Sequence, residues 1–124
     1  MKIKHHALTA MLAMTSMTLG ANAAWAHAEL KQATPAVDGS VQAAPAEVTL
    51  KFSERLESAF SAVIVRDAVG KRVDKADGHI DRADRTVIRA SLQPLSPGTY
   101  IVEWRALTAD THRTEGAFIF RIGQ

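Results

Sequence analysis

The sequence feature that most constrains the fold is a two-residue alternation of apolar and polar side chains. From Tyr100 onward every second position is large and apolar, with Val102 and Trp104 on the same side as Tyr100. Segments 47–52 and 117–122 alternate in the same way. This period belongs to an extended strand with one buried face and does not fit the 3.6-residue period of a helix. We therefore expect these segments to be β-strands whose alternate side chains form a core.

Turn residues separate the apolar segments at short intervals, and no stretch of the sequence has a convincing amphipathic helical pattern. About seven short strands are expected, at positions 28–34, 47–52, 59–66, 72–75, 85–92, 100–106 and 117–122, with 72–75 as a short edge strand. Polar turns or loops are expected at positions 37–40, 53–58, 67–71, 77–81 and 110–116. Many short strands with frequent turns are typical of an all-β sandwich.

The Leu-Ser-Pro-Gly-Thr-Tyr stretch at 95–100 supports this architecture. Such a pattern is common where a β-sandwich turns a corner and a tyrosine hydroxyl at the strand start bonds back to the preceding backbone. We expect Tyr100 to make this bond and Trp104, which is in phase with it, to pack in the core. The sequence has no cysteine, so the domain depends on its apolar core for stability.

Residues 1–26 have the pattern of a secretory signal peptide. A lysine-containing start precedes a mostly apolar run over 7–19, which is too short to span a bilayer. The Ala-Trp-Ala stretch at 24–26 places small residues at −3 and −1 of a cut before His27. We expect a signal peptide at 1–26, one domain at 27–124, a periplasmic location, and no membrane span after cleavage.

The cleavage position decides the composition of the exported chain. Cuts before Ala24 and before Glu29 satisfy the same small-residue rule. Only a cut before His27 gives the candidate metal ligands farther along the chain a terminal histidine as a partner. Removing 26 of the 124 residues takes all four methionines and two lysines. The remaining 98 residues hold 13 basic and 13 acidic side chains and are formally neutral. Neither a nucleic acid nor an anionic membrane is therefore an expected partner.

A histidine at the mature N-terminus is a candidate metal ligand. His27 would offer its α-amino nitrogen and its imidazole to one ion, a chelate that an internal histidine cannot make. Asp110 and His112 are two residues apart, a spacing that places both side chains on one face of an extended chain. Three nitrogens and one carboxylate oxygen suit Cu(II), which leads the divalent affinity order, although zinc can bind the same groups tetrahedrally.

Each candidate ligand also has an ordinary structural explanation. The terminal histidine can be a simple chain end, and Asp110 can cap a turn through backbone hydrogen bonds. His79 lies in a polar segment and is expected to be exposed to solvent. Asp77, Asp81 and Asp84 resemble a loose calcium loop, but their spacing fits no EF-hand, and a solvated surface is expected there.

Several short motifs occur in order along the whole of 27–124, and their combination is more specific than any one of them. They are His27 at the expected mature start, Thr34-Pro35-x-x-x-Gly39-Ser40, Pro45-Ala46, Leu50-x-Phe52-Ser53-Glu54, Leu95-x-Pro97-Gly98-Thr99-Tyr100-x-Val102-x-Trp104-Arg105, Asp110-Thr111-His112 and Gly116-x-Phe118-x-Phe120. This combination resembles the CopC copper-resistance family of periplasmic copper-binding proteins, including its YobA-like members.

The resemblance implies a small Greek-key β-sandwich or barrel, cupredoxin-like or immunoglobulin-like, that binds one Cu(II) ion. The implied ligands are the amine and imidazole of His27, the side chains of Asp110 and His112, and, in some members, Glu54. The implied partner is a CopD-like inner-membrane protein that imports copper.

The chain departs from this family in two respects. Some relatives carry a second, methionine-rich Cu(I) site, but all four methionines here lie within 1–26, so no such site is expected. Arg113 follows the Asp-x-His motif at a position where relatives often have proline. It places a cation beside the ligand loop.

Three functions remain open on the sequence. The favoured one is a non-enzymatic carrier or buffer of Cu(II) in copper homeostasis or resistance. An N-terminal histidine joined by a second histidine also resembles the histidine brace of lytic polysaccharide monooxygenases, but an aspartate ligand favours Cu(II) over Cu(I), and no row of exposed aromatic residues is expected. The third is a metal-free, immunoglobulin-like interaction module.

Overall fold

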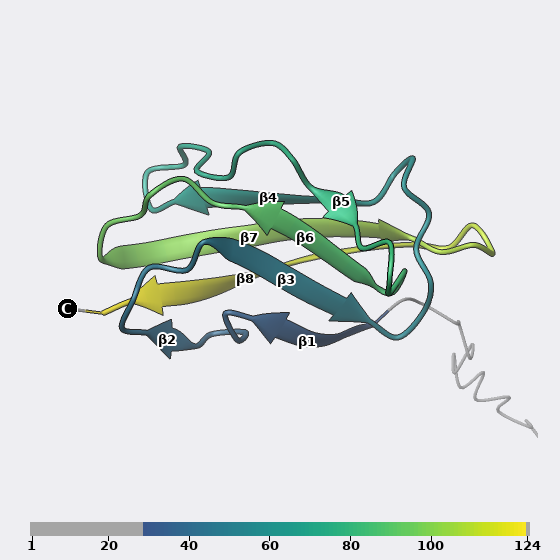
Figure 1. Ribbon diagram of the computed structural model, residues 1–124, viewed down its shortest axis with the longest axis horizontal. Coiled ribbons are helices and arrows are strands. Elements are labelled where there is room, and N and C mark those ends of the chain that lie inside the picture. The colour runs from purple at the N-terminus through teal and green to yellow at the C-terminus, as the bar shows by residue number, and fades with distance from the viewer. Residues whose placement is uncertain (1–28, 124) are drawn as a thin grey trace, which may run out of the picture.

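The computed structural model describes residues 29–123, which form two four-stranded β-sheets. The strands are β1 (Leu30–Thr34), β2 (Ser40–Val41), β3 (Glu47–Phe52), β4 (Ala62–Asp67), β5 (His79–Ile80), β6 (Val87–Ser91), β7 (Gly98–Leu107) and β8 (Arg113–Ile122). One sheet has the order β1-β3-β6-β5 and the other the order β2-β8-β7-β4, and Figure 1 shows the first layered over the second. The predicted all-β sandwich is confirmed.

Residues 29–123 contain no helix, and hence none that is long and apolar enough to cross a membrane. The predictions for the signal peptide at 1–26, the cleavage position and His27 lie outside the described residues.

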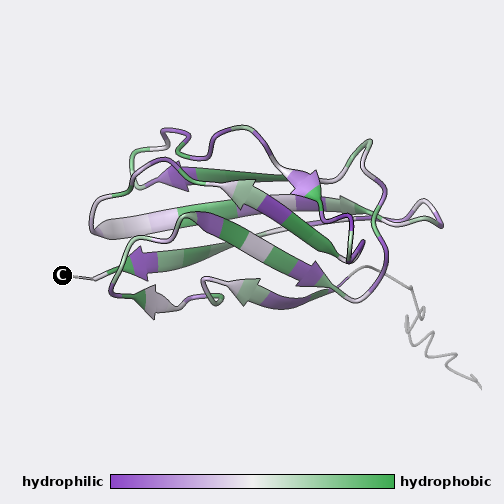
Figure 2. Ribbon diagram, in the orientation of Figure 1, coloured by the Kyte–Doolittle hydropathy of each residue, from purple (hydrophilic) through white to green (hydrophobic). Residues whose placement is uncertain are grey.

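The core lies between the two sheets and is built from the alternation seen in the sequence. Figure 2 shows hydrophobic and hydrophilic residues following one another along the strands. Burying a large apolar side chain contributes roughly 1.5–3 kcal/mol. The buried side chains of the three strands predicted from alternation are Val48, Leu50, Phe52, Tyr100, Val102, Ala106, Phe118, Phe120 and Ile122.

Tyr100 makes the predicted corner contact near the start of β7. Its hydroxyl donates a hydrogen bond to the backbone carbonyl oxygen of Ser96, 2.5 Å away. The ring is buried and stacks on Phe120, with the ring centroids 5.4 Å apart. Tyr100 therefore links the turn before β7 to the core beneath the β7–β8 hairpin.

Trp104 packs against the core, as predicted, but it remains half-buried. The residue directly opposite it on β8 is Gly116, and the indole ring spreads over this glycine. A Cβ atom at position 116 would lie 2.6 Å from Cζ2 of Trp104. The ring also packs edge-on against Phe52, with the centroids 5.0 Å apart. A glycine has no side chain to cover the ring, and this explains why burial is less complete than the strand phase predicts.

Two short strands lie in segments for which the sequence predicts a turn or a loop. β2 pairs in parallel with the end of β8, and β5 pairs antiparallel with β6. A two-residue strand is defined by its backbone partners and has no side-chain period that a sequence could reveal. Conversely, the expected edge strand at 72–75 makes only isolated bridges, between Arg66 and Arg72 and between Asp74 and Leu92.

Several strand boundaries also differ from the predicted ones, and the largest shifts are at the starts of β8 and β4. β8 begins at Arg113 rather than at 117, because the hairpin ladder continues through polar residues until Leu107 pairs with Arg113. β4 begins at Ala62 rather than at 59, and Phe60 lies in the preceding turn with 52% of its surface exposed. Phe60 is therefore not a core residue.

Asp74 is a buried carboxylate between β4 and β5, with none of its side chain exposed. It accepts hydrogen bonds from the Arg72 guanidinium at 2.9–3.0 Å and from the backbone N–H groups of Val65 and Ala76 at 2.8 and 3.0 Å. Burial alone would raise the pKa of Asp74, but these donors together outweigh burial and hold the pKa below its ordinary value. The carboxylate thus holds the segment between β4 and β5 against β4 through the bond from Val65.

Candidate metal centre

Asp110 and His112 lie in the loop that joins β7 to β8. The N–H of Thr108 donates to the carbonyl oxygen of His112 at 3.0 Å, and the N–H of Thr111 donates to the carbonyl oxygen of Thr108 at 2.9 Å. Thr111 has a φ of 70°, in the left-handed region that β-branched residues rarely adopt. The chain therefore turns sharply between Asp110 and His112.

The two side chains lie next to each other on this turn. His112 Nδ1 is 2.9 Å from Asp110 Oδ2. The side chain of His112 is 36% exposed and that of Asp110 is 48% exposed, so an ion or another protein can reach both. The spacing in the sequence predicts that they share one face of an extended chain. The structure brings them together through a tight turn instead.

Thr108 is a residue of this site that the sequence reasoning misses. It is buried, and its hydroxyl donates a hydrogen bond to Asp110 Oδ1. This bond first, and the contact with His112 second, lower the pKa of the Asp110 carboxyl group. The carboxylate is therefore ionised at neutral pH. The only sequence signal for this role is a threonine two residues before an aspartate, and such pairs are too common to identify a site.

The start of the described chain lies at the same end of the sandwich as this loop. The N–H of Glu29 donates to the hydroxyl of Ser53 at 2.9 Å, and the N–H of Ser53 donates to the carbonyl oxygen of Glu29 at 2.8 Å. Three residues after Ser53, Leu56 forms a bridge with Thr108. Figure 1 shows the beginning of β1 and the β7–β8 loop at one end of the molecule. Segments from the two ends of the domain therefore approach each other here.

Glu54 follows Ser53 at this end and is half-buried. Among residues 29–123, no three side chains of histidine, cysteine, aspartate or glutamate are placed to hold one metal ion together. Within this range Asp110 and His112 are thus a pair, and Glu54 is not grouped with them. His27, the expected further donor, lies outside the described residues, so the ligand roles stay predictions.

The other polar residues singled out in the sequence have structural partners. His79 is exposed, as expected, and its Nδ1 lies 2.9 Å from the backbone carbonyl oxygen two residues earlier. Asp81 pairs with Arg89 at 2.7 Å, and Asp84 pairs with Lys51 at 2.8 Å. These carboxylates connect strands and loops of one sheet. The sequence predicts a solvated surface here, and the structure adds these ion pairs to it.

Comparisons with known proteins agree with one another. A family profile described as the CopC domain matches residues 30–123. The chain is 32% identical over 112 residues to Protein YobA of Escherichia coli strain K12, covering 90% of each chain. It is 38% identical over 105 residues to Copper resistance protein C of Pseudomonas syringae pv. tomato, covering 80% of this chain and 82% of the relative.

A solved structure extends this similarity to three dimensions. The crystal structure of PcoC, a methionine-rich copper resistance protein from Escherichia coli, is 35% identical and superposes with a TM-score of 0.69. The match covers 78% of this chain and 99% of PcoC. The sandwich and the motifs quoted from the sequence thus point to the same group of proteins.

Proposed function

This chain belongs to the CopC domain family, and on that premise we propose that it is a periplasmic carrier or buffer that binds one Cu(II) ion in copper homeostasis or resistance. The observation that carries the proposal is the Asp110–His112 pair, 2.9 Å apart on an exposed loop. The proposed ligands are the amine and imidazole of His27 and the side chains of Asp110 and His112. Glu54 is proposed as a weak or outer ligand.

The contacts within the pair support separate roles for the two nitrogens of His112. Nδ1 faces Asp110 Oδ2, so the proposed copper donor is Nε2. In the metal-free chain this contact orients the imidazole ring. An ion on Nε2 would lie on the far side of the ring from Nδ1, so Asp110 has to turn away from Nδ1 to bind the same ion. The Thr108 hydroxyl helps to hold the charged carboxylate in place.

The anchored start of the chain supports His27 as the chelating residue. Two hydrogen bonds hold Glu29 against Ser53 at the end of the sandwich that carries the loop. His27 precedes Glu29 by two residues, a span of about 7 Å in an extended chain. Cleavage before His27 would turn a backbone amide into an amine. The processed chain, and not its precursor, would therefore present a bidentate terminus.

The donor set supports Cu(II) rather than Cu(I) as the cargo. Thioether sulfur is a ligand that selects Cu(I). The similar PcoC is described as methionine-rich, whereas every methionine of this chain precedes position 18. Nitrogen and carboxylate donors suit divalent ions, and Cu(II) leads their affinity order ahead of zinc. We therefore propose one site, with no separate Cu(I) site.

The exposure of the pair supports handing copper on to another protein. Asp110 and His112 are each about one-third to one-half exposed, so competing ligands can approach the ion. The proposed recipient is a CopD-like inner-membrane protein that takes the copper by ligand exchange. The similar protein from Pseudomonas syringae is named for copper resistance, and the proposal assigns no enzymatic activity to this chain.

Titration of the metal-free protein beginning at His27 tests the proposal. In competition with a chelator of known affinity, the wild type is expected to bind one Cu(II) ion per chain. The variant His112→Gln should bind Cu(II) at least about 100-fold more weakly, because it loses a ligand. His79→Gln is the matched control, since His79 is an exposed histidine outside the site. Equal affinities of the two variants would refute the site.

A chain with one extra residue before His27 tests the terminal chelate separately. Its affinity should fall by orders of magnitude, and an unchanged affinity would exclude the chelate. A wild type that binds no stoichiometric copper would instead support the interaction module. Oxygen consumption with a reductant and polysaccharide should not exceed that of free copper, and a larger rate would support the monooxygenase alternative.

A further inference from the structure

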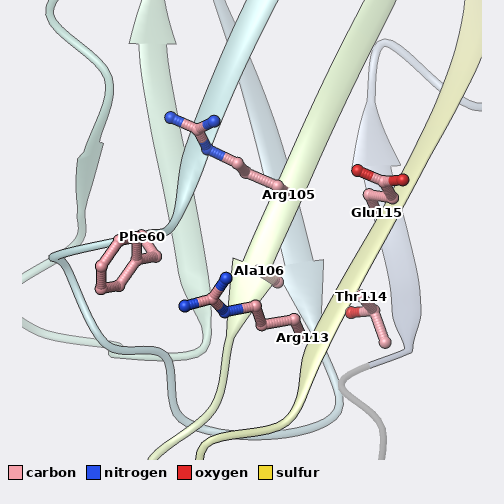
Figure 3. Close-up of a pocket in the computed structure, with 6 residues that line it drawn as sticks. All are labelled: Phe60, Arg105, Ala106, Arg113, Thr114 and Glu115. Atoms are coloured by element: carbon pink, nitrogen blue, oxygen red, sulfur yellow. The ribbon is translucent and has the colours of Figure 1, made fainter.

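A surface pocket beside the β7–β8 loop combines two arginines with an exposed aromatic ring. Its volume is about 430 Å³, within the range of roughly 300–1,000 Å³ that small-molecule sites occupy. The residues that line it are drawn in Figure 3 and are Phe60, Arg105, Ala106, Arg113, Thr114 and Glu115.

Arg113 is positioned by Phe60. The guanidinium carbon of Arg113 lies 4.8 Å from the centroid of the Phe60 ring. A guanidinium held over a ring by cation–π attraction keeps the N–H groups that point away from the ring available for a ligand. The Phe60 side chain is 52% exposed, so its ring supports this arginine rather than the core.

Neither arginine of the pocket has a carboxylate partner within residues 29–123. Three other arginines of this range form ion pairs, but Arg105 and Arg113 do not. Glu115 is the acidic residue of the pocket wall, and it pairs with neither. Figure 3 shows the Arg113 guanidinium extending toward Phe60 and the Arg105 guanidinium extending to the same side of β7, whereas the Glu115 carboxylate lies on the other side. The pocket thus presents two guanidinium groups that form no ion pair within residues 29–123, and Glu115, which lies opposite Arg105 in the β7–β8 register, adds one negative charge to its wall.

We propose that this pocket binds a small organic anion that carries two carboxylate groups. A guanidinium presents a fork of N–H donors that matches a carboxylate in a bidentate way. Arg105 and Arg113 would each take one carboxylate, and the exposed ring of Phe60 would contact the carbon atoms between them. Neither arginine is a proposed copper ligand, so this binding goes beyond the proposed function and does not require the metal.

Titration of the metal-free protein with succinate, followed by NMR chemical shifts, tests this site. Saturable shifts are expected at the pocket residues. Acetate, with one carboxylate, should bind at least about tenfold more weakly. Arg105→Gln and Arg113→Gln should each weaken succinate binding at least about tenfold, because each removes a charged hydrogen-bond donor. Arg121→Gln is the matched control, since Arg121 is exposed at the far end of β8.

Native-like spectra of all variants establish that they are folded. Phe60→Leu keeps apolar volume but removes the ring face, and it should weaken succinate binding several-fold by releasing Arg113. Absence of saturable shifts in the wild type would overturn the proposal, as would equal affinities of Arg113→Gln and Arg121→Gln. Acetate binding as tight as succinate binding would overturn the assignment of two carboxylates. Because no metal is present, a failed copper site changes none of these outcomes.

Discussion

Replacing Gly116 with alanine tests the packing of Trp104 across the β7–β8 hairpin. The new Cβ atom would lie 2.6 Å from Cζ2 and 2.8 Å from Cε2 of the indole ring. The ring cannot withdraw freely, because it also packs against Phe52 at a centroid distance of 5.0 Å. Overpacking of this kind costs about 1–3 kcal/mol. In a domain of this size, each kcal/mol lowers Tm by about 4–8 °C.

Thermal and urea unfolding measure this cost, and two further variants locate its source. Gly78→Ala is the control, because its nearest contact would be an ordinary 3.5 Å, and it should change stability by no more than about 0.5 kcal/mol. In a Trp104→Leu background the clash with the ring is absent, so Gly116→Ala should cost clearly less there than in the wild type. The same cost in both backgrounds would refute the indole ring as the obstacle.

Three other variants probe single polar contacts. Asp74→Asn should lower the free energy of unfolding by about 2–3 kcal/mol at neutral pH, because it removes a buried, paired carboxylate. Since the folded-state pKa of Asp74 lies below the unfolded value of about 3.9, this cost should be fully present above that value and shrink as pH falls through the folded-state pKa. Urea unfolding at several pH values checks it, and a cost that persists at strongly acidic pH would contradict it. Tyr100→Phe keeps the ring but removes the bond to the Ser96 carbonyl, and it should cost about 1 kcal/mol in the same assay; no measurable cost would show that the bond contributes nothing. Thr108→Val keeps the shape of the side chain, and an NMR titration should show the pKa of Asp110 rising toward its ordinary value. An unchanged pKa would exclude the hydroxyl as its cause.

The long strands were predictable because a buried sheet face repeats every two residues. β3, β7 and the second half of β8 carry that repeat, and their alternate residues form the core. β2 and β5 have two residues each and exist through backbone pairing with β8 and β6. No local pattern can show such pairing, because it depends on which segments the folded chain brings together.

The candidate site was predictable to a similar degree. Adjacency of Asp110 and His112 is expected from their spacing in an extended chain, whereas the structure brings them into contact through a tight turn. The contribution of Thr108 depends on a turn whose central residue, Thr111, adopts a left-handed conformation. The stacking of Arg113 on Phe60 joins the start of β8 to the turn before β4. Such contacts arise from tertiary structure, and one sequence does not contain them.

The approach of the chain's beginning to the β7–β8 loop would make a bound copper ion a removable cross-link. Positions 27 and 110 are 83 residues apart, and closing a loop of that length in an unfolded chain costs about 4.5 kcal/mol of chain entropy. The folded sandwich holds Glu29 at the same end as the β7–β8 loop before any metal arrives. With the proposed ligands, copper would therefore bind the folded state and resist its unfolding and proteolysis. Delivery to a recipient would reverse that effect, so the protein's lifetime would report whether it carries its cargo.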